Sequence, residues 1–152
     1  MPPPSERAGG VENSLSEQST MIPARLARMR DLRGFLEGFC AAAGVAREAC
    51  LRLNLVLEEL FTNTVRHGHH GDSDAPVWVT LERQGEQVRL TYEDCAPPFN
   101  PYGRLGADSP DTTLEMRKIG GLGILLTEEM AATRDYAYVF GRNRIRLALK
   151  AG

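Results

Sequence analysis

The chain contains 152 residues, which suits a single domain with a buried core, since domains commonly run to about 100–150 residues. Its composition is 42% hydrophobic and 25% charged, as in an ordinary globular domain, which argues against a disordered or fibrous class. Eighteen Lys and Arg against 20 Asp and Glu give a formal charge of −2, so we expect no direct nucleic-acid binding, which usually needs a basic excess.

The first residues combine Pro, Gly, Ser and Glu with few apolar side chains, which predicts a disordered N-terminal tail over 1–15 and one domain over 16–152. The start has no apolar signal segment, and no stretch approaches about 18 consecutive apolar residues, so we expect neither export nor membrane insertion. Cys40, Cys50 and Cys95 have no paired spacing, which argues against a disulfide framework or a zinc site and favours the cytoplasm.

Two stretches with helical periodicity follow. The first predicts a helix over about 24–43, ended by Gly44, and the second a helix over about 46–67, ended by Gly68 and Gly71. The apolar residues that define the first are Leu26, Met29, Leu32, Leu36 and Phe39, and those of the second are Leu53, Val56, Leu57, Leu60, Phe61 and Thr64.

Apolar residues then alternate with polar ones, which predicts strands. The expected strands are 77–82, 88–92, 133–140 and 143–149. Between the two pairs, residues 96–119 predict a long irregular connection of the kind that often forms a functional lid, and the glycines at 120–123 precede a third helix. Because helices and hairpins are segregated, we expect an α+β fold: a two-layer sandwich with the helices on one face of a mostly antiparallel sheet.

Two polar residues form an edge beside the apolar face of the second helix. Glu59 and Asn63 are about 40° apart around the helix axis, whereas Glu58 is about 140° from Asn63. A carboxylate and an amide oxygen one turn apart suit a hard cation such as Mg²⁺ and the orientation of an attacking hydroxyl. An ordinary amphipathic helix with a solvated Glu and Asn is the alternative.

Asp94 continues the alternation of Val88, Leu90 and Tyr92, which places its carboxylate on the apolar face at the end of a strand. A buried carboxylate requires hydrogen-bond donors, and the amino group of adenine would be one. Alternatively, Asp94 bends outward and opens a turn before Pro97.

The third signal is the segment from Lys118 to Ile124, in which Gly120, Gly121 and Gly123 would let a phosphate approach the start of a helix. The segment matches neither GxGxxG nor the P-loop motif, so a Rossmann or P-loop protein is excluded. A plain turn is the alternative.

The order of these signals resembles the GHKL ATP-binding domains. Residues 59–68 resemble their N box, 94–101 the first glycine box and 120–124 the second. More narrowly, the chain resembles the stand-alone anti-sigma-factor serine/threonine kinases of bacteria over about residues 16–150.

This resemblance implies a Bergerat fold that binds ATP between the helices and the sheet, under residues 96–119 as a lid. It implies that Glu59 is the general base, that Asn63 binds Mg²⁺ and that Asp94 reads adenine. The other nucleotide-binding residues that it implies are Arg66, His67, Ala96, Phe99, Lys118, Gly120, Gly121, Leu122, Gly123 and Ile124.

The resemblance further implies a kinase that holds a sigma factor and phosphorylates a serine of an anti-anti-sigma partner of the STAS type. Such kinases often form homodimers. The alternative is a nucleotide-binding or sigma-binding module of the same fold that transfers no phosphate. Two departures keep it open: Ala96 stands where the first glycine box has Gly, and Ile119, rather than an arginine, precedes the glycine pair.

Overall fold

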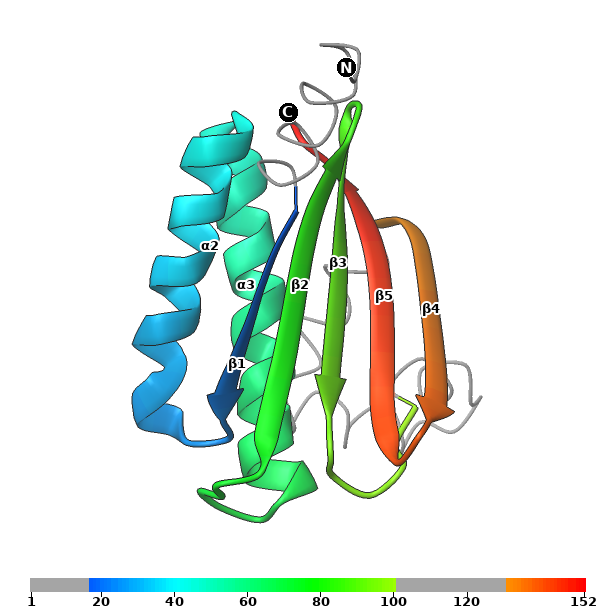
Figure 1. Cartoon of the computed structure of the whole chain (residues 1–152). Coiled ribbons are helices and arrows are strands. Elements are labelled where there is room, and N and C mark those ends of the chain that lie inside the picture. Colours follow the sequence, from blue (N-terminus) through cyan, green and yellow to red (C-terminus); the bar gives the residue numbers. More distant parts are fainter. Residues whose placement is uncertain (1–16, 101–130) are drawn as a thin grey trace, which may run out of the picture.

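The computed structural model describes residues 17–100 and 131–152 and shows two layers (Figure 1). Five strands form one sheet in the order β1-β2-β3-β5-β4, and every neighbouring pair is antiparallel. Two α-helices, α2 and α3, lie on one face of this sheet. The elements are β1 (Glu17–Pro23), η1 (Leu26–Arg28), α2 (Met29–Ala43), α3 (Arg47–Asn63), η2 (Thr64–Gly68), β2 (Pro76–Gln84), β3 (Gln87–Asp94), β4 (Ala131–Val139) and β5 (Arg142–Lys150).

The first predicted helix is present as α2, preceded by a single 3-10 turn, η1. The loop before β2 fixes its start, because Asp72 accepts a hydrogen bond from the Leu26 backbone N–H at 2.9 Å. At its end Gly44 adopts a left-handed φ of 67°, and its N–H bonds the Cys40 carbonyl oxygen. A glycine tolerates this conformation without steric cost, which explains why the helix stops there.

The second predicted helix is α3, but its last turn widens. The α-helix ends at Asn63, and residues 64–68 form the π-helical turn η2. The backbone N–H groups of His69 and Gly71 complete the end by bonding the carbonyl oxygens of Thr64 and Val65. Single π-turns of this kind are frequent at functional sites.

The inward faces of the strands bury alternate residues against the helices, as the period-two pattern predicts. The buried strand residues include Val77, Val79, Leu81, Val88, Leu90, Tyr92, Ile145, Leu147 and Leu149. The edge strand β1 was not predicted, because only Ile22 among its seven residues is buried. Backbone pairing with β2, rather than an apolar pattern, holds it in place.

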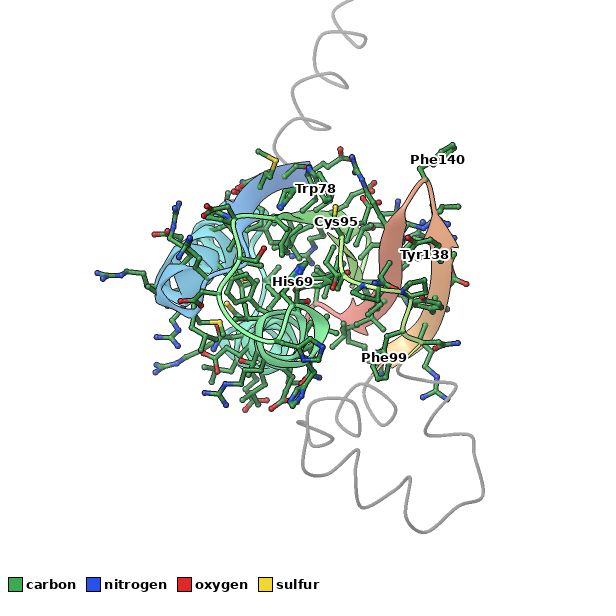
Figure 2. All side chains as sticks on the ribbon, turned by 90° about the horizontal axis from the view of Figure 1, so that it is seen from below. His69, Trp78, Cys95, Phe99, Tyr138 and Phe140 are labelled. Atoms are coloured by element: carbon green, nitrogen blue, oxygen red, sulfur yellow. The ribbon has the colours of Figure 1, made fainter. Side chains whose placement is uncertain are left out.

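The hairpin of β4 and β5 turns at Phe140 and Gly141, which have φ angles of 53° and 76°. The Phe140 side chain is fully exposed and projects from the tip of this hairpin (Figure 2). The predicted third helix, residues 101–119 of the connection and the N-terminal tail lie outside the described residues. Within the described part of the chain, neither helix has the length and apolar character needed to cross a membrane.

Candidate functional site

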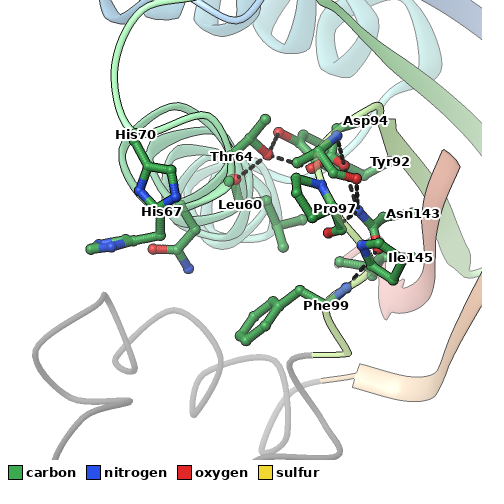
Figure 3. Close-up of a pocket in the computed structure, with 14 residues that line it drawn as sticks. Leu60, Thr64, His67, His70, Tyr92, Asp94, Pro97, Phe99, Asn143 and Ile145 are labelled. Atoms are coloured by element: carbon green, nitrogen blue, oxygen red, sulfur yellow. Dashed lines mark hydrogen bonds between the residues drawn. The ribbon is translucent and has the colours of Figure 1, made fainter.

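A pocket of about 350 Å³ lies between the helix end and the sheet (Figure 3). The residues lining it are Leu60, Asn63, Thr64, His67, Gly68, His70, Tyr92, Asp94, Ala96, Pro97, Pro98, Phe99, Asn143 and Ile145. Five residues that the sequence assigns to the nucleotide site are among them: Asn63, His67, Asp94, Ala96 and Phe99. The fold thus brings residues from the predicted N box and first glycine box to one cavity.

Asp94 is buried at the end of β3, with 7% of its surface exposed. Its Oδ2 atom accepts a hydrogen bond from the Thr64 hydroxyl at 2.8 Å. Its Oδ1 atom accepts from the Asn143 amide at 2.8 Å and from the Ala96 backbone N–H at 3.2 Å. The carboxylate therefore faces inward, as the strand alternation predicts, and does not bend outward. It also accepts the Ala96 N–H in the turn that follows β3. These donors offset the cost of burying its charge.

Two buried hydroxyls support this carboxylate from behind. The oxygen atoms of Tyr92 and Thr64 are 2.7 Å apart. Burial, reinforced by the negative charge of Asp94, raises the pKa of Tyr92 well above its ordinary value, so the phenol stays protonated. Tyr92 can then donate to Thr64 while Thr64 donates to Asp94, which orders the three groups as one chain.

Asn143 completes the wall from β5. It stands directly opposite Asp94 in the pairing of β3 and β5. Besides Asp94, its amide nitrogen lies 3.0 Å from the carbonyl oxygen of Ala96 and 3.1 Å from that of Pro97. The sequence reasoning missed Asn143, although the alternation Asn143, Ile145, Leu147 places it on the apolar face by the same logic that singled out Asp94.

Glu59 and Asn63 each carry a buried oxygen with no bonding partner in the described part of the chain. These atoms are Glu59 Oε2 and Asn63 Oδ1, and neither has a hydrogen-bond partner among the residues that the structure describes. Burial, and secondarily the charge of Glu58, raises the pKa of Glu59 above its ordinary value. Asn63 lines the pocket, whereas Glu59 is one helical turn away and does not contribute to the lining.

Glu58 faces the neighbouring helix instead. Its carboxylate forms an ion pair with Arg33 of α2 and accepts a hydrogen bond from Asn54 at 3.2 Å. The helical count that separated Glu58 from the Glu59–Asn63 edge therefore describes the geometry correctly. Arg66, which the resemblance places at the nucleotide, is exposed and does not line the pocket.

Ala96 fits its position in the turn. Only His70 and Phe140 among the described non-glycine residues have positive φ, so the Ala96 backbone is one that an alanine adopts without strain. Its methyl group is buried against Gly68, where an added Cβ would lie 2.7 Å from the Ala96 Cβ. The alanine that departs from the first glycine box is thus matched by a glycine on η2.

The predicted phosphate-binding end lies outside the described residues. It comprises Lys118, Gly120, Gly121, Leu122, Gly123 and Ile124. Their role, like the roles assigned to Glu59, Asn63 and Asp94, stays a prediction.

Comparison with known proteins identifies the family and the fold. Residues 22–149 match the histidine kinase-like ATPase domain family, and the chain belongs to this family. One relative is the serine-protein kinase RsbW of Listeria innocua, which is 29% identical over 98 residues. This alignment covers 62% of each chain. The family match confirms the predicted GHKL-type ATP-binding domain.

Two solved structures share the fold. The RsbU and RsbW domains of a Mycobacterium tuberculosis protein superpose with a TM-score of 0.59 at 17% identity, covering 88% of this chain and 32% of that one. A chain of the SiaB–SiaC complex from Pseudomonas aeruginosa gives a TM-score of 0.62 at 12% identity. The match covers 95% of this chain and 95% of that one. At these identities the likeness confirms the predicted α+β sandwich.

Proposed function

We propose that this chain binds ATP with Mg²⁺ and transfers the terminal phosphate to a serine of a protein partner. The observation that carries the proposal is the pocket itself. It is lined by a buried acceptor, Asp94, and by Asn63, whose amide oxygen has no partner among the described residues, and Glu59 lies beside it. Asp94 offers only acceptor atoms when ionised, which suits the 6-amino group of adenine. The RsbW relative is named a serine-protein kinase, which supports the transfer step.

Asn63 would hold the magnesium ion. Its buried Oδ1 has no partner among the described residues and is an oxygen ligand of the kind that a hard cation takes. No three His, Cys, Asp or Glu side chains converge in the described residues, so a protein-only metal cage is not the arrangement proposed. Magnesium, bound largely through phosphates and water, would supply charge neutralisation at the transferred group.

Glu59 would act as the general base. A serine hydroxyl of the partner attacks the γ-phosphorus, the bond from that phosphorus to the bridging oxygen of ADP breaks, and the serine proton passes to the Glu59 carboxylate. Oε2 is buried and has no partner among the described residues, so no donor from these residues occupies the lone pairs that would accept the proton. The elevated pKa of Glu59 makes it a stronger base than an exposed glutamate.

The partner and the setting follow from the family resemblance. We infer an anti-anti-sigma protein of the STAS type as the phosphate acceptor and a sigma factor as the second partner, in the cytoplasm. A homodimer belongs to the same proposal, because the resemblance implies it.

The test is a transfer assay with labelled ATP, magnesium and the anti-anti-sigma protein encoded near this chain. We expect label on a serine of that protein. Glu59→Gln should abolish labelling while ATP still binds, because the base is lost and the pocket is intact. Glu58→Gln is the matched control: its carboxylate pairs with Arg33 on the opposite side, so transfer should persist. ATP binding without transfer by the wild type would leave only a nucleotide-binding regulatory module.

A further inference from the structure

The orientation of the Asn143 amide is fixed by its surroundings. Its nitrogen faces three oxygen atoms, those of Asp94, Ala96 and Pro97, at 2.8 to 3.1 Å. A flipped amide would turn its oxygen toward these acceptors, including a carboxylate. Since the side chain is only 5% exposed, no water layer would relieve that repulsion. Asn143 is therefore held in one orientation.

The amide oxygen of Asn143 faces two donors on the other side. The Phe99 backbone N–H donates to it at 2.9 Å, and the Tyr136 hydroxyl of β4 donates to it at 2.5 Å. The Phe99 N–H also lies 3.2 Å from the Tyr136 oxygen. Asn143 and Tyr136 thus anchor the chain that leaves β3 to both strands of the β4–β5 hairpin.

These contacts set what Asp94 can still bind. A carboxylate has about four acceptor positions. Three are filled, by the side chains of Asn143 and Thr64 and by the backbone N–H of Ala96. The remaining capacity accepts a donor such as the 6-amino group of a purine and repels a 6-carbonyl oxygen. How strongly Asp94 discriminates between a 6-amino and a 6-carbonyl purine depends on whether its carboxylate is held in one plane.

We propose that Asn143, supported by Tyr136, is a positioning residue that determines base selectivity. It holds the Asp94 carboxylate for a 6-amino purine and fixes residues 96–99 along the pocket. This inference rests on the proposed function, since it takes ATP to be the ligand. Asn143 acts through Asp94 and the backbone and need not touch the base.

The test compares ATP with ITP, which has a carbonyl in place of the 6-amino group. In Asn143→Ala, ATP affinity should fall roughly tenfold or more, the loss typical of a hydrogen bond to a charged group, while ITP affinity changes little. The ratio of the two affinities therefore falls by a similar factor. A merely structural role, which lowers the amount of folded protein, would leave this ratio unchanged. Titration of the folded variant by calorimetry measures both constants.

Tyr136→Phe is the milder variant and decides the matter if Asn143→Ala does not fold. It removes one donor to Asn143, so we expect a smaller loss of selectivity and faster hydrogen exchange at the Phe99 amide. Tyr138→Phe is the matched control, because Tyr138 is two residues further along β4 and 46% exposed. It should change neither quantity.

An unchanged ATP-to-ITP ratio in folded Asn143→Ala, or an unchanged Phe99 exchange rate in Tyr136→Phe, overturns the proposal. Failure of the proposed function is a different result: the wild type would then bind neither nucleotide. The exchange measurement on the free protein would still decide whether Asn143 and Tyr136 anchor residues 96–99.

Discussion

Glu59 combines features that an ordinary surface glutamate lacks. One of its carboxylate oxygens is buried and has no partner in the described part of the chain, and burial raises its pKa. The neighbouring Glu58, which is ion-paired with Arg33, adds repulsion to the ionised form. Keeping such a group charged at neutral pH costs folding free energy, which is expected of a residue retained for chemistry rather than stability.

This cost gives the first prediction, that Glu59→Gln is more stable than the wild type at neutral pH. Because the folded-state pKa of Glu59 is raised, the folded protein binds its proton more tightly than the unfolded chain does. Ionisation therefore destabilises the wild type above the folded pKa, and this penalty disappears as the pH falls below the unfolded pKa of about 4.3. The stability gain of the variant should vanish over the same window. Thermal unfolding at a series of pH values measures it.

Glu58→Gln serves as the control, since it removes an ion pair with Arg33 and should give no comparable gain. A Glu59→Gln protein that is less stable than the wild type at neutral pH would show that the carboxylate has a stabilising partner. It would also count against its role as a free base.

At the scale of elements, η2 decides how the helix end meets the strand exit. The wider π turn places Thr64 inside, where it bonds Asp94, and sets His67 on the pocket lining. It also brings Gly68 against Ala96, at a separation that leaves no room for another methyl group. The first residues after β3 and the last turn of the helix are therefore fitted to each other.

The second prediction concerns this contact. Alanine at position 68 would put two Cβ atoms 2.7 Å apart, well inside the optimum of about 3.5–4.0 Å. We expect Gly68→Ala to lower the free energy of unfolding by about 1–3 kcal/mol, the usual cost of overpacking. The double variant Gly68→Ala with Ala96→Gly should recover most of it. Urea unfolding of the three variants measures the coupling.

Gly38 supplies the control for helix propensity. It lies in α2, and an added Cβ would meet nothing within 4 Å, so Gly38→Ala should stabilise by up to about 1 kcal/mol. If Gly68→Ala were stabilising as well, the residues around Ala96 would have moved to accept the added methyl group, and the predicted overpacking would be wrong.

The elements that were predicted from the sequence are those in which buried residues recur at a regular spacing. The helices α2 and α3 and the strands β2, β3 and β5 each bury a regular face, so apolar spacing located them. The edge strand β1 buries a single side chain and is held by backbone pairing, which leaves no periodic signal. The widening of η2 depends on contacts beyond the helix and cannot be predicted from spacing within it.

At the scale of the whole molecule, the pocket is assembled from segments far apart in sequence. Asp94 was predicted because its own strand turns it inward, whereas Asn143 gains its role only when β5 is paired beside β3. Glu59 and Asn63 were separated from Glu58 by helical geometry alone. The roles of the glycines after residue 119 came from resemblance, and they lie outside the described residues.

A ligand that binds this pocket binds only the folded chain and therefore stabilises it. The last prediction follows from this linkage. At a ligand concentration of about 100 times Kd, binding adds about 2.7 kcal/mol, or roughly 5–10 °C in Tm for a chain of this size. ATP with magnesium should produce this shift, and removing the metal with EDTA should reduce it. In Asn63→Ala, ATP should shift Tm by the same amount with and without magnesium, because the metal ligand is lost while Asp94 remains. Equal Tm shifts in the wild type with and without magnesium would contradict the proposal that the ion binds at this site.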